Sequence, residues 1–142
     1  MKTARYSRIK GVFLLGFLIG ACLLATGCGS ETSGTSGATA IATGGYHTCE
    51  VLSVGTVQCW GYNESGQLGN GSTTRSSLPV PVSNITTAIA IAAGGDAEDG
   101  VSHTCALLSG GTIQCWGSNS DGQLGNGSTT NSNVPVTVLG IP

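Results

Sequence analysis

Residues 47–82 have the sequence HTCEVLSVGTVQCWGYNESGQLGNGSTTRSSLPVPV, and residues 103–138 have the sequence HTCALLSGGTIQCWGSNSDGQLGNGSTTNSNVPVTV. The two stretches are 56 residues apart and are identical at 25 of 36 positions. Upstream, Gly44-Gly45 matches Gly94-Gly95 at an offset of 50, so the second copy carries a six-residue insertion. A repeat of this length is typical of a supersecondary unit that packs against copies of itself. Function is therefore expected in a repeated surface rather than in one catalytic pocket.

Each copy contains four short runs that favour β-strands, separated by Gly, Asn, Asp, Ser and Thr. This alternation of strand and turn residues predicts antiparallel strands, and four of them per repeat are typical of a β-propeller blade. The sequence therefore predicts an all-β fold of two four-stranded antiparallel blades. The expected strands are 39–43, 47–52, 56–60 and 78–82 in the first copy, and 88–93, 103–108, 112–116 and 134–138 in the second.

The motif CWGxNxxGQLGNG occurs in both copies, each time after an HTC tripeptide and before a Pro-Val strand. It resembles the repeat of the regulator of chromosome condensation family, and the resemblance extends from residue 39 to the C-terminus. The family's namesake is a seven-bladed propeller, so the resemblance implies an incomplete ring of two repeats, over 39–87 and 88–142. Within each repeat, Gly55 and Gly111 are expected in left-handed hairpin loops, and Leu68 and Leu124 are expected to point inward.

The N-terminus has the pattern of an export signal, with four basic residues among the first ten before an apolar run over 11–25. Its end resembles a bacterial lipoprotein signal, which implies a signal peptide over 1–27 and a lipid on Cys28. A polar Gly/Ser/Thr tether over 28–38 favours Cys28 over the alternative, Cys22, which two leucines follow. The expected location is the cell envelope, at the outer membrane or cell surface, with the N-terminal lipid in the membrane. An uncleaved membrane anchor and plain secretion are the alternatives.

The chain from residue 28 onward is acidic, because Arg75 is its one basic residue against seven acids, and +1 − 7 = −6. Proteins that bind nucleic acid need Lys and Arg to replace condensed counterions. The sequence therefore excludes DNA and RNA as partners. The seven acidic residues are Glu31, Glu50, Glu64, Asp96, Glu98, Asp99 and Asp121.

Four cysteines form two symmetric pairs within the predicted hairpins. Cys49 and Cys59 lie opposite each other about Val54, and Cys105 and Cys115 lie opposite each other in the second copy. Opposed strand residues have Cβ atoms about 4.5–5.5 Å apart, which is close to disulfide geometry. An exported chain also meets an oxidising compartment. We expect two structural disulfides, with free thiols as an alternative.

His47 and His103 each lie two residues before a cysteine, on the same strand face, so a zinc site is also geometrically conceivable. It lacks a fourth ligand at a recognisable spacing, and no metal or cofactor is predicted. We expect each histidine to bond a neighbouring loop instead. Trp60 and Trp116 lie beside the second cysteine of each pair, hence on the opposite face, where packing between blades is expected.

The insertion in the second copy contains three acids, Asp96, Glu98 and Asp99, and is a candidate partner-binding loop. A solvated loop is the simpler interpretation, and the register of a calcium loop is missing. The sequence also lacks Gly-x-Ser-x-Gly, a phosphate-binding loop and His-Glu-x-x-His, so no catalytic residues and no enzyme activity are predicted.

The leading functional hypothesis is a bacterial cell-envelope lipoprotein that acts as a protein–protein interaction module. The alternatives are a truncated propeller fragment without independent function, an inhibitor of a secreted hydrolase, and nucleotide exchange on a small GTPase as in the eukaryotic namesake. Two blades leave two outer faces bare, with apolar residues such as Ile89 and Ile91. The chain is therefore expected to form a homo-oligomer, to dock on another repeat-bearing chain, or to be marginally folded.

Overall fold

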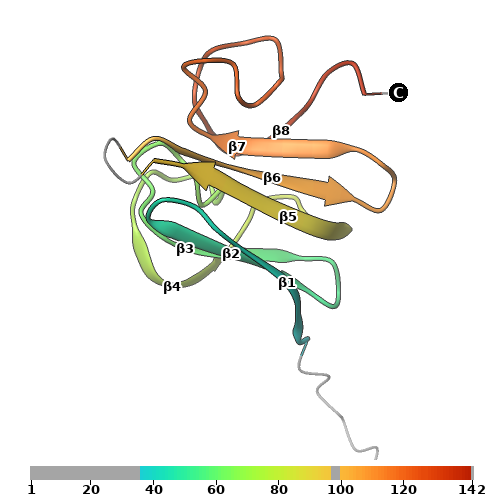
Figure 1. Ribbon diagram of the computed structural model, residues 1–142. Coiled ribbons are helices and arrows are strands. Elements are labelled where there is room, and N and C mark those ends of the chain that lie inside the picture. The colour runs from blue at the N-terminus through green and yellow to red at the C-terminus, as the bar shows by residue number, and fades with distance from the viewer. Residues whose placement is uncertain (1–35, 97–99, 142) are drawn as a thin grey trace, which may run out of the picture. The chain divides into compact units, whose positions relative to one another are not determined.

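A computed structural model describes residues 36–96 and 100–141 of the chain. These residues contain eight β-strands in two four-stranded antiparallel sheets and no helix (Figure 1). We call the sheet of β1–β4 blade 1 and the sheet of β5–β8 blade 2. The strands are β1 Ala38–Thr43, β2 His47–Leu52, β3 Val57–Gly61, β4 Ser76–Pro81, β5 Ala88–Gly95, β6 Ser102–Leu108, β7 Ile113–Gly117 and β8 Ser132–Thr137.

The strands confirm the all-β prediction, with boundaries that shift by one or two residues. In each blade the strand order equals the chain order, β1-β2-β3-β4 and β5-β6-β7-β8. The predicted hairpin register is confirmed, since Cys49 pairs with Cys59 and Cys105 pairs with Cys115. The fourth strands begin earlier than expected, at Ser76 and Ser132, because both serines pair with the last glycine of the third strand.

The hairpin turns have the conformation that their glycines predict. Gly55 and Gly111 have φ angles of 82° and 83°, in the left-handed region that glycine adopts without a steric penalty. In each turn the glycine N–H donates to the carbonyl three residues before it, on Leu52 or Leu108. The two hairpins are therefore built alike.

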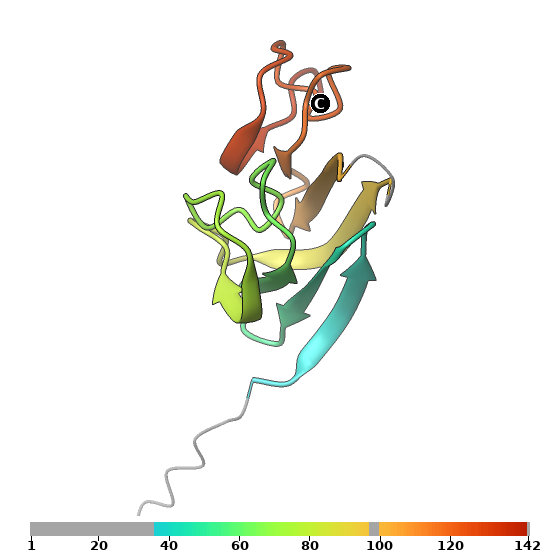
Figure 2. The same cartoon turned by 90° about the vertical axis from the view of Figure 1, so that its left-hand side faces the viewer.

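The core lies between the two blades, which contact each other most along β1, β2 and β5. In the view of Figure 2, the loop after β3 reaches from blade 1 toward blade 2. Side chains alternate between the two faces of each sheet, so each blade buries one face against the other blade. The buried hydrophobic cluster consists of Cys49, Val51, Val57, Cys59, Leu68, Val82, Ile85, Ala88, Ala106 and Trp116.

The predicted signal peptide over 1–27, the lipidation candidates Cys22 and Cys28, and most of the tether lie outside the described residues, as do Glu98 and Asp99. Within the described part of the chain, no helix is long and apolar enough to cross a membrane. Residues Thr35–Pro142 form one compact unit through their own contacts.

Candidate interaction surfaces

Trp116 on β7 of blade 2 packs against a loop of blade 1 and forms a hydrogen bond with it. Its indole is completely buried, and its Nε1–H donates to the Gln67 carbonyl over 2.9 Å. The Thr104 hydroxyl donates to the same carbonyl over 3.1 Å. Gly69 admits the ring, because a Cβ at that position would lie 2.7 Å from Trp116 Nε1. The expected packing of this tryptophan between the blades is therefore confirmed.

The loop that receives Trp116 is held in shape by one buried asparagine. Asn63 accepts from the Leu68 N–H over 2.9 Å and donates through Nδ2 to the carbonyls of Ser72 and Thr74, each over 3.0 Å. These bonds turn Leu68 into the core, where it is fully buried as predicted. Asn119 makes the equivalent bonds in blade 2, and Leu124 is likewise buried.

His47 on β2 bonds across the interface rather than to a neighbouring loop, which corrects the sequence-based expectation. Its Nε2 lies 2.8 Å from Thr104 Oγ1. Because that hydroxyl gives its proton to Gln67, Nε2 must be the donor, and Nδ1 is then an unprotonated, buried atom without a partner among the described residues. Burial, together with the nearby His103, lowers the pKa of His47 from 6.5 to about 4. His47 is therefore a neutral structural residue at neutral pH.

This depressed pKa predicts that acid destabilises the fold. Well above pH 6.5 His47 is neutral in both the folded and the unfolded chain. As the pH falls toward 4, the unfolded chain binds a proton at His47 and the folded chain does not, so the stabilisation is progressively lost. We expect the free energy of unfolding to drop by about 2 kcal/mol between about pH 7 and about pH 5, from the shift in this one group. Urea unfolding at both pH values measures the drop.

The His47→Asn variant is the control for this prediction, since its residue 47 does not titrate. Its free energy of unfolding should depend less on pH over the same range. Burial also lowers the pKa of His103, whose contribution remains in the variant. Equal pH dependence in the wild-type chain and in His47→Asn would contradict the assignment of the effect to His47.

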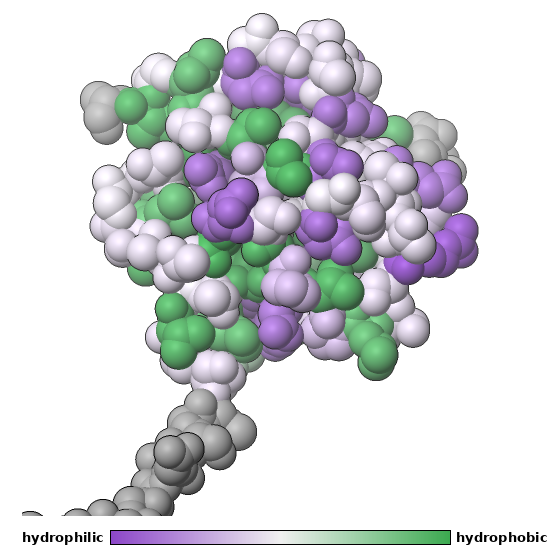
Figure 3. Space-filling model, turned by 180° about the vertical axis from the view of Figure 1, so that it is seen from behind, coloured by the Kyte–Doolittle hydropathy of each residue, from purple (hydrophilic) through white to green (hydrophobic). Residues whose placement is uncertain are grey.

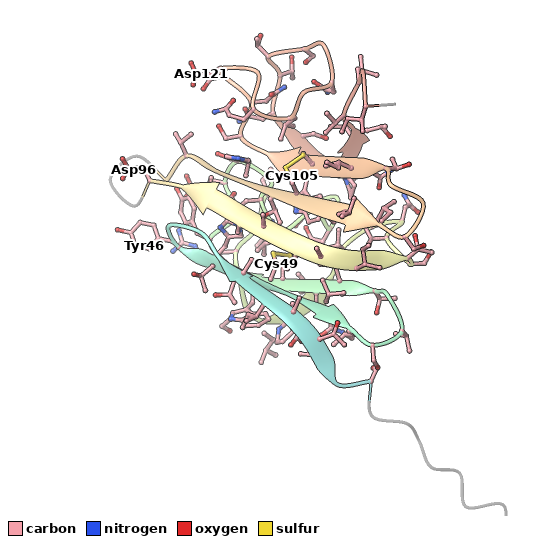
Figure 4. The ribbon with its side chains drawn as sticks, turned by 45° about the vertical axis from the view of Figure 1, so that its right-hand side comes forward. Tyr46, Cys49, Asp96, Cys105 and Asp121 are labelled. Carbon is pink, nitrogen blue, oxygen red and sulfur yellow. A yellow bond between two sulfur atoms is a disulfide. The ribbon has the colours of Figure 1, made fainter. Side chains whose placement is uncertain are left out.

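The two cysteine pairs lie at bonding distance, one in each blade (Figure 4). The Sγ atoms are 2.09 Å apart in the Cys49–Cys59 pair and 2.13 Å apart in the Cys105–Cys115 pair. Within residues 36–96 and 100–141, no three His, Cys, Asp or Glu side chains are grouped so that they could hold a metal ion. The zinc alternative therefore has no support in this geometry.

The outer face of blade 1 carries three aromatic side chains, of which the two tyrosines have no aromatic counterpart in blade 2. We define this face by Tyr46, Thr48, Glu50, Leu52, Gln58, Trp60 and Tyr62. Tyr46 and Tyr62 meet edge to face, with ring centroids 6.4 Å apart, and Tyr46 is 59% exposed. Trp60 is only half-buried here, so the expected packing between blades does not hold for it within the described residues. Three of the four described aromatic side chains thus gather on one face.

Arg75, the one basic residue after the predicted signal, lies at the edge of this face. Its guanidinium is 5.7 Å from the centroid of the Tyr62 ring and 3.6 Å from Glu64 Oε1. A hydrogen bond to Glu64 raises the pKa of Tyr62. Because the ion pair is mostly exposed, it contributes little to stability, about 0–1 kcal/mol. Arg75, Glu64 and the two tyrosines therefore form one cluster at the edge of this face.

The inserted segment of blade 2 begins close to this end of blade 1. Asp96 is exposed and lines an open cleft together with Gly45, and Figure 4 shows Asp96 and Tyr46 at the same edge of the molecule. At the other end of the insertion, the Gly100 carbonyl accepts from Gln67 Nε2 over 3.5 Å. The partner-binding role predicted for Asp96 remains a prediction.

The outer face of blade 2 is more apolar. We define it by His103, Cys105, Leu107, Ile113 and Cys115. Ile91 of β5 joins Cys105, Leu107 and Ile113 around a shallow hollow on this face, and it also packs against the core, so it is less bare than expected. Ile89, by contrast, is 58% exposed. On the side of the molecule that Figure 3 shows, hydrophobic side chains form separate patches among hydrophilic ones.

Sequence reasoning passed over the cluster of Tyr46, Tyr62, Glu64 and Arg75. Their counterparts in the second copy are Ser102, Ser118, Ser120 and Asn131. The signal was therefore present as a set of differences between two otherwise similar copies. Those differences become informative only when the structure places all four side chains at one end of one sheet.

The comparison with protein families identifies the repeat. Models described as "Regulator of chromosome condensation (RCC1) repeat" match residues 55–107, and residues 38–67 and 100–123. Zebrafish (Danio rerio) protein RCC2 homolog is 34% identical over 93 residues, which are 65% of this chain and 18% of that protein. Ultraviolet-B receptor UVR8 of Arabidopsis thaliana is 36% identical over 100 residues, which are 69% of this chain and 21% of the receptor. The chain thus spans about a fifth of each of these relatives.

Solved structures agree on the fold. Prp20p of Saccharomyces cerevisiae has a TM-score of 0.64 at 19% identity, over 75% of this chain and 26% of that chain. Human WBSCR16 has a TM-score of 0.59 at 25% identity, over 76% of this chain and 28% of that chain. Yeast RCC1 (Prp20), solved with Kap60 bound, has a TM-score of 0.57 at 26% identity, over 72% of this chain and 22% of that chain.

Proposed function

Because the chain belongs to the regulator of chromosome condensation repeat family, we propose that it is an exported, lipid-anchored module without enzyme activity that binds a protein partner. The observation that carries the proposal is the outer face of blade 1, where Tyr46, Trp60 and Tyr62 lie beside Arg75. Tyr, Trp and Arg are the residues most enriched at the energetic centres of protein interfaces. A related repeat protein, yeast RCC1 (Prp20), was solved with the protein Kap60 bound to it.

The net charge of the chain favours a protein partner that has a basic surface. The segment from residue 28 onward has a net charge of −6, and Glu50 lies on the proposed binding face. Such a surface repels nucleic acid and accelerates encounter with basic surfaces. The N-terminal lipid would hold the module at the cell envelope. Anchoring by the lipid and binding by the face are separate parts of the proposal and are tested separately.

Binding is tested with a variant that gives blade 1 the residues of blade 2, Tyr62→Ser with Arg75→Asn. Crosslinking in cells, followed by mass spectrometry, should show a partner attached near Tyr46 or Tyr62 of the wild-type chain, and at least a tenfold lower yield in the variant. The matched control is Val54→Gly with Leu78→Val, which also installs residues of blade 2 at exposed sites of blade 1. An equal yield in all three proteins would contradict the assignment of binding to this face.

Anchoring is tested at Cys28. The Cys28→Ser variant should no longer incorporate labelled palmitate and should leave the detergent phase on phase separation, because its thiol is the expected site of the lipid. A single acyl chain binds membranes only marginally, so partition of the wild-type protein reports on full lipidation. Unchanged labelling in Cys28→Ser, or loss of labelling only in Cys22→Ser, would overturn this part of the proposal.

A further inference from the structure

The two blades contribute different surfaces to the interface between them, so the interface is directional. Blade 1 contributes the face of His47, Cys49, Val51, Val57 and Cys59, together with the loop that carries the Gln67 carbonyl. Blade 2 contributes the face that carries Thr104, Ala106 and Trp116, all fully buried. We call the first the receiving face and the second the inserting face. The contact therefore joins two different surfaces, a receiving face and an inserting face. Neither surface has to be complementary to a copy of itself.

The outer face of blade 2 repeats the receiving face residue by residue. His103 replaces His47, the Cys105–Cys115 pair replaces Cys49–Cys59, and Leu107 and Ile113 replace Val51 and Val57. The loop beside it has the same sequence, Gly-Gln-Leu-Gly, over 122–125, and Asn119 shapes it with the bonds that Asn63 makes in blade 1. Blade 2 thus presents a complete receiving face, and no described residue of a further blade covers it.

The outer face of blade 1 does not repeat the inserting face. It keeps Thr48 and Trp60, the counterparts of Thr104 and Trp116. However, Ser102, Ala106 and Ser118 are at most 3% exposed in the interface, and blade 1 has Tyr46, Glu50 and Tyr62 at those positions. Two large rings would occupy space that serines leave free, and the carboxylate of Glu50 would be buried among apolar groups at a high desolvation cost.

We propose that the outer face of blade 2 docks a repeat blade from another chain, one that offers Thr and Trp flanked by small residues. Tyr46, Glu50 and Tyr62 prevent the outer face of blade 1 from docking in this way on a second copy of the chain. One outer face of the molecule then accepts a blade and the other does not. The docking surface is the outer face of blade 2, whereas Tyr46, Glu50 and Tyr62 lie on the outer face of blade 1, which is also the proposed partner-binding face. Association of purified variants tests the docking, and crosslinking in cells tests partner binding, so the two proposals can fail separately.

The test removes the three side chains that block docking through the outer face of blade 1. The triple variant Tyr46→Ser, Glu50→Ala, Tyr62→Ser gives blade 1 the inserting face of blade 2. The segment from residue 29 to 142 contains the whole compact unit and is used for sedimentation velocity from about 1 to 100 μM, the range of modest protein–protein affinities. The wild-type chain should remain monomeric, and the triple variant should associate head to tail.

Two further variants identify the contact in the triple variant. Trp60→Ala removes the indole equivalent to Trp116, and Ile113→Glu places a charge on the outer face of blade 2. Each should weaken the association by about 30-fold or more, as for a buried aromatic anchor at an interface. Cooperative thermal unfolding of each protein establishes that it is folded before association is measured.

A mixing experiment tests the same contact when the triple variant forms only short oligomers. Wild-type chain added in excess should cap the triple variant into heterodimers, because the wild-type receiving face is intact and the outer face of its blade 1 is blocked. The proposal is overturned if the triple variant stays monomeric, if the wild-type chain associates equally well, or if Trp60→Ala and Ile113→Glu leave the association unchanged.

Discussion

Replacing Trp116 with alanine is expected to lower the free energy of unfolding by about 3–5 kcal/mol, the usual range for a buried tryptophan. The side chain is fully buried, so its removal leaves a large cavity between the blades. It also removes the indole donor to the Gln67 carbonyl, which Thr104 alone would then satisfy. A small two-blade unit has a total stability of the same order, so the variant should be largely unfolded at 25 °C. Circular dichroism and urea titration measure the loss.

Trp60→Ala is the matched control, because it removes the same residue type at the equivalent position of the other blade. Trp60 is half-buried on the outer face, and its indole makes no hydrogen bond to another described residue. Its removal should cost about 1 kcal/mol, the typical value for a point mutation away from the core. Similar losses of free energy of unfolding in the two variants would contradict the assignment of Trp116, and not Trp60, to the interface between the blades.

Loss of a hairpin disulfide is expected to cost about 2.5–3 kcal/mol per bond, because each closes a loop of ten residues. The Cys49–Cys59 pair is fully buried, whereas Cys105 is only half-buried on the outer face of blade 2. A mild reductant should therefore open Cys105–Cys115 first. Timed alkylation with mass spectrometry of proteolytic fragments measures the order of opening.

Variants separate the two disulfide bonds in this prediction. Cys49→Ala with Cys59→Ala should be destabilised at least as much as Cys105→Ala with Cys115→Ala, since the first pair also contributes to the hydrophobic cluster between the blades. Four thiols that react in the native, unreduced protein would contradict the presence of both bonds. Urea unfolding of the two double variants, compared with the wild-type chain, gives the energies.

The regular part of the fold could be predicted from sequence because it depends on local patterns. Alternation around Val54 places Cys49 opposite Cys59, and the hairpin glycine Gly55 adopts the left-handed conformation that its turn requires. Leu68 points inward because a set of loop bonds, centred on Asn63, is encoded within a dozen residues. Each of these features repeats in blade 2 with the same residues.

The direction of the interface could not be predicted from one copy. His47 and His103, or Trp60 and Trp116, occupy equivalent positions, and nothing local says that only His47 and Trp116 lie between the blades. Their environments differ because the chain has a direction, which places blade 2 on one side of blade 1 only. The structure therefore determines which member of each equivalent pair is structural and which is available for binding.

Trp116 lies buried in the interface between the blades, and Trp60 lies outside it. Hydrogen exchange of the two indole N–H groups, followed by NMR and assigned with the Trp60→Phe variant, tests this arrangement directly, because these are the only two tryptophans in the chain. We expect one slowly exchanging signal, from Trp116, and one rapidly exchanging signal, from Trp60, at every protein concentration. Two signals with equal protection, or a protected Trp60 in the wild-type chain, would contradict this arrangement.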